Sequence, residues 1–267
     1  MKTHARWLAL AAILAVSACE TVPPPPPPPP ADAPVAVPDF LSAALADPAR
    51  PEADRARDAA RKPGQILAWA GLKPGMKVID LVPGQGYFTR IFSRAVGPKG
   101  RVYAYVPDEL TAVAKGRPPS VAAWVGKPPF ANTRMILRRM PQFGAPEKVD
   151  MIFTAQNYHD LHLPFMGPVD LAVVNRQAFN ALKPGGVYIV IDHAARAGTG
   201  PAQWDTLHRI DPAVVRREIE AAGFIYEGET RLLRNARDPL TGNVFDAGIR
   251  GKTDQFAFKF RKPGSAR

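Results

Sequence analysis

The sequence predicts an α/β fold built on a mostly parallel β-sheet. Residues 78–82 form a short apolar run that holds one carboxylate, Asp80, which is typical of a buried parallel strand. A turn with two glycines, residues 83–86, follows this run. Apolar residues then recur at the spacing of an amphipathic helix: Phe88, Ile91, Phe92 and Ala95. A strand, a glycine turn and a helix in this order place a ligand site beyond the carboxyl end of the strand.

Other segments supply the remaining elements of such a fold. Helices are predicted over residues 40–46, 52–61, 65–71, 172–182 and 212–222, and residues 108–130 predict a helix with an irregular loop. Further strands are predicted over residues 101–106, 134–137, 148–154 and 187–192. The alternating residues 224–233 and 254–261 predict an antiparallel pair at one edge of the sheet.

The first 19 residues predict an export signal. Two basic residues, Lys2 and Arg6, precede an apolar stretch, residues 7–16, that is too short to span a bilayer. The stretch ends in Val16-Ser-Ala-Cys19, which resembles the lipobox of bacterial lipoproteins and implies lipidation of Cys19, the only cysteine of the chain. We therefore expect an exported cell-envelope lipoprotein on the periplasmic side of the inner or outer membrane. A secretory peptide cut near Ala18, or a cytosolic protein with an apolar start, are the alternatives.

Residues 20–38 predict a linker, and residues 39–267 predict one folded domain. The eight prolines of residues 23–30 favour a polyproline II stalk of roughly 25 Å. The net charge of +11 would suit anionic partners, but no run of five or more Lys or Arg residues is present, so we favour a solvated basic surface. No signature of a nucleic-acid-binding module is present, so we expect no nucleic-acid partner. The sequence gives no indication of the oligomeric state.

The segment Asp80-Leu-Val-Pro-Gly-Gln-Gly86 resembles motif I of class I S-adenosylmethionine (SAM)-dependent methyltransferases, Asp-Leu-Gly-x-Gly-x-Gly. Leu182-Lys-Pro-Gly-Gly186, before a hydrophobic strand, is similar to a second frequent feature of that family. The resemblance covers about residues 64 to 192. It implies the Rossmann-like class I methyltransferase fold: a mostly parallel seven-stranded sheet with helices on both faces and an antiparallel edge strand. It also implies SAM as cofactor.

The resemblance implies a set of residues that bind the cofactor: Asp80, Val82, Gly84, Gly86, Tyr87, Asp108 and Asn157. Two positions depart from the family pattern. Val82 replaces the first glycine, and because it is β-branched and precedes a proline, we expect it in extended backbone. Val106 replaces the acidic residue that holds the ribose hydroxyls, so either Asp108 or Glu109 reaches back to the ribose, or the site binds the cofactor poorly.

Polar residues gather after two other strands, at the sheet edge where sites form. By the resemblance, the segment Ala155 to His162 faces the transferred methyl group. We expect His159 and His193 to act as bases and Tyr158, Asp160 and Asp192 to bind a small-molecule substrate. A satisfied, purely structural role for His159 is the alternative.

These features favour transfer of a methyl group from SAM to a small-molecule acceptor. A non-catalytic ligand-binding lipoprotein on the same scaffold is the main alternative, because fold alone does not give function. A metal site made from His159, His162, Asp160, Asp192 and His193 is a third possibility. No metal-motif spacing is met, so no metal is predicted. The third glycine of the dinucleotide fingerprint is absent, which argues against dinucleotide oxidoreduction.

Overall fold

A computed structural model describes residues 35–264. The predicted signal peptide, residues 1–19 with Cys19, lies outside the described residues, as does the predicted linker up to residue 34. Among the helices of residues 35–264, none is both long and apolar enough to cross a membrane.

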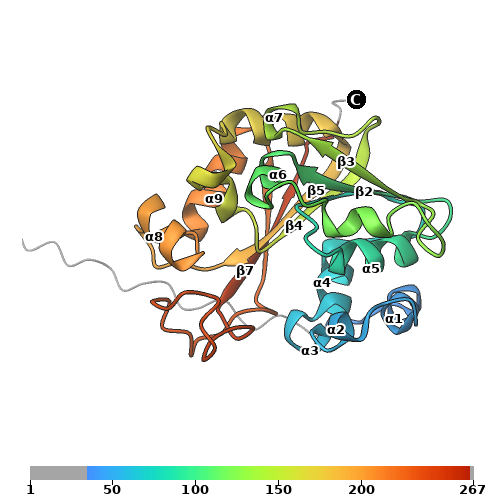
Figure 1. Ribbon diagram of the computed structural model, residues 1–267, viewed down its shortest axis with the longest axis horizontal. Helices are drawn as coiled ribbons and strands as arrows, with labels where there is room; N and C mark the ends of the chain where they lie inside the picture. Colours follow the sequence, from blue (N-terminus) through green and yellow to red (C-terminus); the bar gives the residue numbers. More distant parts are fainter. Residues whose placement is uncertain (1–34, 265–267) are drawn as a thin grey trace, which may run out of the picture. The chain divides into compact units, whose positions relative to one another are not determined.

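The predicted sheet is present. Its seven strands are β1 (Lys77–Leu81), β2 (Arg101–Pro107), β3 (Thr133–Arg138), β4 (Val149–Ala155), β5 (Leu182–His193), β6 (Ile225–Thr230) and β7 (Gln255–Arg261). Their order across the sheet is β3-β2-β1-β4-β5-β7-β6 (Figure 1). β7 runs antiparallel to both neighbours, and the other pairs are parallel. The fold class is therefore confirmed, with the antiparallel strand one position in from the β6 edge.

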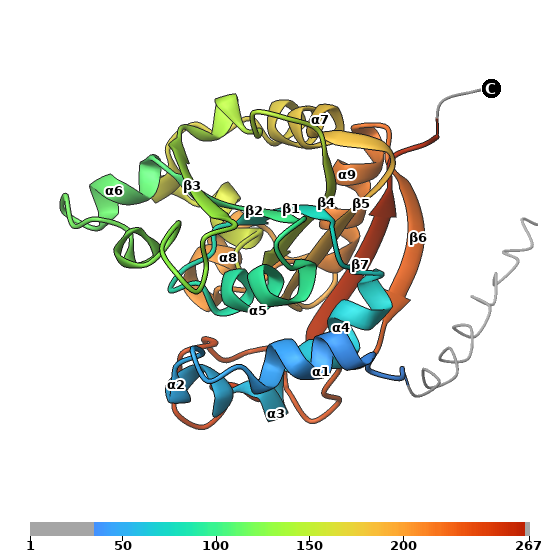
Figure 2. The same ribbon diagram turned by 90° about the vertical axis from the view of Figure 1, so that its right-hand side faces the viewer.

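Helices cover both faces of the sheet. They are α1 (Asp39–Ala46), α2 (Glu52–Arg55), α3 (Asp58–Arg61), α4 (Pro63–Ala70), α5 (Tyr87–Val96), α6 (Glu109–Val113), α7 (Leu171–Ala181), α8 (Pro201–Leu207) and α9 (Pro212–Ala221). Four short 3-10 helices are η1 (Ser120–Ala123), η2 (Met140–Gln142), η3 (His159–His162) and η4 (Pro164–Met166). In Figure 2, α1, α4 and α5 lie on one side of the sheet and α7 and α9 on the other.

The two faces carry separate apolar cores because successive side chains of a strand point to opposite sides. Val78 and Phe153 pack with the apolar residues of α1, α4 and α5. Ile79 and Ile152, their neighbours along β1 and β4, pack with those of α7 and α9. All four side chains are fully buried. The apolar strand runs of the sequence are thus explained by burial on both faces.

The charged stretch 52–61 differs from its prediction. It forms two single-turn helices, α2 and α3, instead of one helix. After the break, the Asp58 carboxylate accepts two hydrogen bonds from the guanidinium of the buried Arg50, at 2.7 and 2.8 Å. Within the helix of the prediction, Asp58 would pair only with residues three or four positions away. A non-local ion pair therefore holds Asp58, and among the local pairs Arg57 and Asp54 still pair three positions apart, at 2.6 Å.

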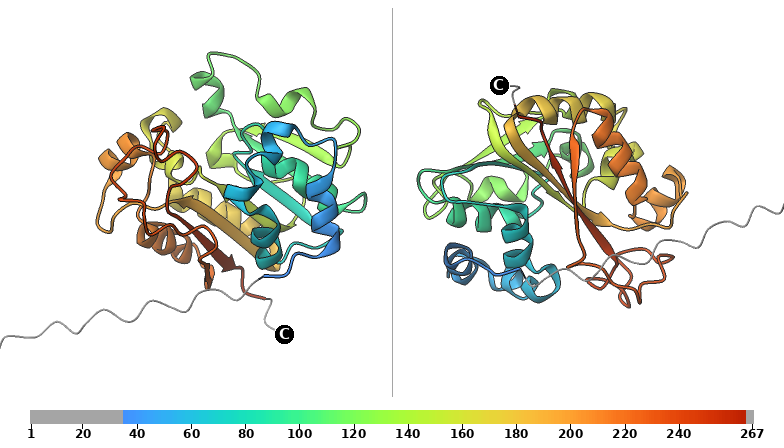
Figure 3. Two further views of the ribbon diagram at one scale, coloured as in Figure 1. Left: turned by 90° about the horizontal axis from the view of Figure 1, so that it is seen from below. Right: turned by 180° about the vertical axis from the view of Figure 1, so that it is seen from behind.

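The segment between β6 and β7, residues 231–254, contains no helix or strand. Figure 3 shows it as the loops, coloured orange to red, at the start of β7. A buried ion pair fixes it: Arg209 donates to both carboxylate oxygens of Asp238, at 2.8 and 3.1 Å. Because β7 is antiparallel, its start lies at the edge where the parallel strands end. The segment is therefore placed beside the candidate site.

Candidate functional site

The turn after β1 forms the centre of the site, and Val82 is the first residue of this turn. The φ of Val82 is +57°, which contradicts the predicted extended backbone. Two bonds explain why a β-branched residue holds this conformation: its N–H donates to the carbonyl of Tyr105 in β2, and its carbonyl accepts from the Asn157 amide, at 2.9 and 3.1 Å. Unfavourable backbone persists where the surroundings fix it in this way, and such positions cluster at functional sites.

The two glycines of the turn serve different purposes. Gly84 has φ +58°, and a Cβ added there would meet no atom within 4 Å, so the backbone faces open space. Gly86 has φ +86°, and a Cβ there would lie 2.2 Å from a ring carbon of Trp124. Gly84 thus keeps a cavity accessible, whereas Gly86 allows Trp124 to pack on the turn.

Two cavities meet at this turn. Each has a volume of about 340 Å³, and both are lined by Val82, Pro83 and Gly84. The first extends across the ends of β1, β4 and β5, and its polar lining residues are Arg57, Arg61, Asp80, Gln85, Gln156, Asn157, His159, Asp160, His193 and His208. The second lies against the end of β2 and is lined by Val106, Leu110, Thr111, Ala114, Arg117, Pro118, Pro119 and Ser120. A ligand that crosses the turn would occupy both.

Asp80 is the buried acidic group of the first cavity. Its carboxylate accepts a hydrogen bond of 2.5 Å from the Thr89 hydroxyl. Burial raises the pKa of the Asp80 carboxyl to about 7, against the opposing effects of the Thr89 hydroxyl and the Arg61 guanidinium. The charge of this carboxyl therefore changes near neutral pH, and a cationic ligand beside it would favour the ionised form.

Arg61 brings a positive charge to the same cavity. It donates to the Gln156 side chain at 2.8 Å, and its guanidinium lies 4.5 Å from the centre of the Tyr87 ring. Tyr87 also lines the cavity and donates to Asp58 at 2.6 Å, so it holds Arg61 in place. Sequence reasoning missed Arg57 and Arg61 as site residues, since nothing local distinguishes them from Arg55.

The acidic residues after β2 do not compensate for Val106. Asp108 is exposed, and its side chain accepts from Thr111 within the same turn. Glu109 accepts from the backbone N–H of Met140, at 3.2 and 3.3 Å. Neither acid is among the residues that line the second cavity. The alternative in which one of them reaches back is therefore wrong, and Asp108, predicted to bind the cofactor, is not among the residues that line either cavity.

Of Asn157 and Tyr158, which follow β4, Asn157 faces the first cavity and Tyr158 is buried in the core. Asn157 lines the first cavity and connects the ends of β1 and β4, because its amide donates to Val82 and to Ala155. Tyr158 is fully buried, with its hydroxyl 3.0 Å from Glu218 and 2.8 Å from the Asn175 amide. The prediction that Tyr158 contacts substrate is therefore wrong; its ring belongs to the core.

His159 is held between two carboxylates. Its Nδ1 lies 2.9 Å from Asp192 and its Nε2 lies 3.2 Å from Asp160. Burial lowers the pKa of His159, but the two carboxylates raise it further, to about 10. His159 is thus an imidazolium at neutral pH, which corrects the prediction that it acts as a base there. Asp192 is fully buried and absent from the cavity lining, so it orients His159 and does not bind substrate as predicted.

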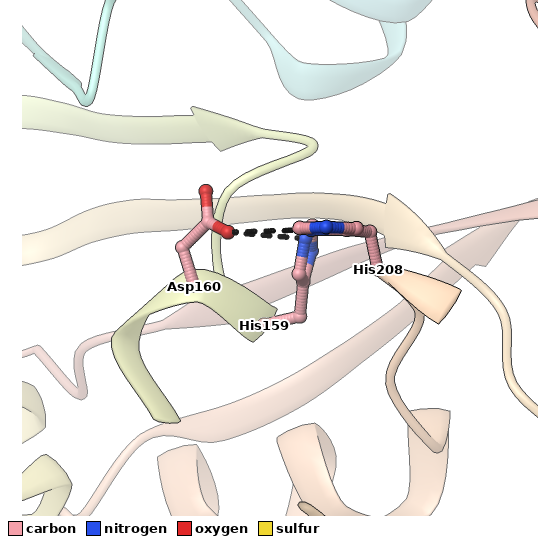
Figure 4. A group of neighbouring side chains, drawn as sticks. All are labelled: His159, Asp160 and His208. Atoms are coloured by element: carbon pink, nitrogen blue, oxygen red, sulfur yellow. Dashed lines mark ion pairs between the residues drawn. The ribbon is translucent and has the colours of Figure 1, made fainter. Parts of the chain in front are cut away.

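The other histidines divide between the cavity and the core. His193 lines the first cavity, with Nδ1 2.8 Å from the Thr253 hydroxyl, and burial lowers its pKa to about 4, so it is neutral. His162 is turned toward Glu218, at 3.2 Å, and packs on Trp204. His208, at the end of α8, completes a group with His159 and Asp160 (Figure 4). His208 lies 49 positions after His159 in the chain, which is not a local pattern, so sequence reasoning missed it.

 

No protein-family model matches the chain. The ubiquinone/menaquinone biosynthesis C-methyltransferase UbiE of Pasteurella multocida (strain Pm70) is 27% identical over 187 residues, which cover 67% of this chain and 64% of the relative. The UbiE protein of Shewanella sediminis (strain HAW-EB3) is 25% identical over 194 residues, 67% of this chain and 68% of the relative. The chain thus spans only 64% and 68% of the length of these two relatives.

Solved structures share the fold. A SAM dependent methyltransferase from Aquifex aeolicus has a TM-score of 0.52 and 21% sequence identity, with 83% of this chain and 97% of that chain covered. The strand order, the glycine turn at the end of β1 and this structural likeness show that the chain has the fold of class I SAM-dependent methyltransferases.

Proposed function

We propose that the protein is a SAM-dependent methyltransferase that acts on a small molecule. The observation that carries the proposal is the pair of cavities, each about 340 Å³, that meet over Val82, Pro83 and Gly84 at the carboxyl end of β1. Pockets for small ligands have volumes of about 300–1,000 Å³, and in α/β sheets they lie at such strand ends. A cofactor with two unlike halves suits two cavities that adjoin across a turn.

The first cavity fits the methionine half of SAM. Asp80 offers a carboxylate to the ammonium group, and Arg61 offers a guanidinium to the carboxylate group. Gly84 leaves the backbone open to a ligand, since a Cβ there would project into free space. The donor set therefore matches both charges of an amino acid.

The second cavity fits the adenosine half. Val106 and Leu110 supply apolar surface, and Thr111 and Ser120 supply hydroxyls that could bond the ribose. The missing carboxylate at Val106 removes one pair of charge-assisted hydrogen bonds, so we expect weaker binding than a site with that acid would give.

Bound SAM would supply a methyl group on a sulfonium centre, and the acceptor displaces it in line, so orientation of the acceptor is the main task of the protein. His193 lines the first cavity as a neutral imidazole and is the residue that can take a proton from an O–H or N–H acceptor. Its low pKa of about 4 makes it a weak base. His159 and Asp160 instead hold the polar part of the acceptor by hydrogen bonds and charge.

A non-catalytic ligand-binding protein on the same scaffold is the second candidate. The observation that favours it is the position of the two acids after β2: Asp108 is exposed and Glu109 bonds Met140. If the second cavity did not bind adenosine, the chain would lack a methyl donor, since fold alone does not give function.

Calorimetric titration of the full chain with SAM and S-adenosylhomocysteine (SAH) tests the proposal. We expect micromolar binding of both ligands, reduced at least tenfold in an Asp80→Asn variant and unchanged in Asp205→Asn, which alters an exposed carboxylate on α8. Absence of binding by folded protein would refute the methyltransferase proposal and leave the ligand-binding scaffold.

We also propose that Cys19 carries a lipid that anchors the protein at the periplasmic side of a membrane. The lipobox-like Val16-Ser-Ala-Cys19 supports this proposal. In cells given labelled palmitate, we expect label in the full chain and none in a Cys19→Ser variant, with Ser17→Ala as the control. Label that persists in Cys19→Ser would contradict the anchor.

A further inference from the structure

We propose that His159, Asp160 and His208 form a binding site for a first-row divalent cation such as Zn²⁺ in the first cavity. All three residues line that cavity. Figure 4 shows that the Asp160 carboxylate points toward the rings of His159 and His208. Two imidazoles and one carboxylate are a donor set that suits zinc, iron or cobalt better than magnesium or calcium. The cation site shares His159 and Asp160 with the proposed acceptor site, and a bound cation would replace the proton on Nε2 of His159.

The spacing of the donor atoms suits a shared cation. Nε2 of His159 lies 3.2 Å from Oδ1 of Asp160, and Nδ1 of His208 lies 4.0 Å from the same oxygen. All the ligand atoms lie within 4.8 Å of one another. A cation with bonds of about 2.1 Å separates its ligands by roughly 3.0 to 4.2 Å. The longest separation therefore needs only a small rotation of one side chain.

The contact of His208 is not explained by hydrogen bonding. A separation of 4.0 Å is too long for a hydrogen bond between Nδ1 and the carboxylate oxygen. His208 is also at φ +53°, a left-handed conformation, with its N–H donating to the Trp204 carbonyl at 2.8 Å. The chain thus turns back at the end of α8 and places a second imidazole beside His159, with ring centres 5.5 Å apart.

Asp192 supplies the outer contact that metal-binding histidines have. A ligating histidine usually gives its other ring N–H to a carboxylate, which fixes the tautomer and the ring orientation. Nδ1 of His159 lies 2.9 Å from Oδ1 of Asp192, and the His159 backbone N–H donates to Oδ2 at 2.8 Å. Asp192 is fully buried, so its carboxylate is fixed and presents Nε2 of His159 to Asp160 and the cavity.

The site has open positions for a ligand. Three protein donors leave at least one coordination position of a tetrahedral cation free, as in catalytic zinc sites. That position faces a cavity of about 340 Å³, which also admits a small molecule. The chemical class of ligand expected there is an oxygen donor, such as water or a hydroxyl group.

Titration with Co²⁺ tests the site, because tetrahedral cobalt gives visible absorption. The full chain, carrying an affinity tag without histidine, is stripped with a chelator, and its absorption is followed as Co²⁺ is added, with Zn²⁺ as competitor. We expect one equivalent bound at micromolar affinity or tighter. Affinity should fall at least 100-fold in His208→Asn and about 10–100-fold in Asp192→Asn.

His162→Asn is the matched control, since His162 lies in the same 3-10 helix as His159 but bonds Glu218. It should bind Co²⁺ as the unaltered chain does. Circular dichroism of each variant verifies the fold, and His208 is partly exposed, so its replacement is compatible with folding. No stoichiometric binding by the unaltered chain, or equal losses in His208→Asn and His162→Asn, would overturn the proposal.

Discussion

The buried ion pair between Arg209 and Asp238 is expected to determine the stability of the loop segment beside the site. Both side chains are fully buried. Arg209 also donates to the carbonyls of Ala194 and Gly242, and Asp238 accepts from the N–H groups of Leu240 and Asp254. An Asp238→Ala variant removes one partner and leaves the guanidinium buried without its counter-charge.

The expected cost follows from that burial. Removal of one partner of a buried pair costs about 3–5 kcal/mol, because the remaining charge is uncompensated. For a domain of this size, each kcal/mol lowers the melting temperature by about 2–4 °C. We therefore expect the melting temperature of Asp238→Ala to fall by roughly 6–20 °C. Since Val244 and Phe245 of the same segment line the first cavity, SAH binding should weaken as well.

Urea unfolding at pH 7 measures the loss in the free energy of unfolding, with Glu220→Ala as the control. Glu220 pairs with Arg216 on the exposed face of α9, where loss of the pair should cost less than about 1 kcal/mol. The double variant Arg209→Met with Asp238→Leu should recover most of the loss. A loss for Asp238→Ala as small as that for Glu220→Ala would refute the reasoning.

The pH dependence of this loss has a defined sign. Burial alone would raise the pKa of Asp238, but its hydrogen bonds with Arg209 and with two backbone N–H groups hold that pKa below its usual value of 3.8. A depressed pKa contributes stability above the unfolded pKa, and this stability disappears as the pH falls through the folded pKa. The difference between the unaltered chain and Asp238→Ala should therefore persist at pH 7 and shrink below about pH 4.

Three further predictions concern the turn after β1. Because the Asp80 pKa is about 7, SAH affinity should fall as the pH drops through 7, and Asp80→Asn should remove this dependence in calorimetric titrations. Thr89→Val removes a hydrogen bond that lowers this pKa, so the same transition should move to higher pH; an unchanged transition would contradict that role. Gly84→Ala should weaken SAH binding and cost roughly 1–2 kcal/mol of stability because of its positive φ. Gly86→Ala should destabilise the fold in urea by clearly more than Gly84→Ala, since its Cβ also meets Trp124; the reverse order would disprove the two roles.

The sequence correctly predicted the elements whose structure depends mainly on residues that are neighbours in the chain. The apolar run of β1 and the glycines after it predicted a buried strand, a turn and a helix, and these are present at Lys77–Leu81 and Tyr87–Val96. The helix that follows Asp211 begins as predicted, because the Asp211 carboxylate accepts from the N–H of Ala213.

The failed predictions involve contacts between distant segments. Val82 was expected in extended backbone, but bonds from Tyr105 and Asn157 hold it in the left-handed region. Arg61 and His208 line the first cavity, but neither directly follows a strand in the sequence. No local pattern therefore assigns them to the site. Sequence reasoning therefore located the site but supplied only part of its residues.

The most direct test of the account is the structure of the protein crystallised with SAH. We predict electron density for the ligand across Val82–Gly84, with the amino acid between Asp80 and Arg61 and the adenine against Val106 and Leu110. Density confined to one cavity, or SAH bound elsewhere on the protein, would contradict the proposed methyl-donor site.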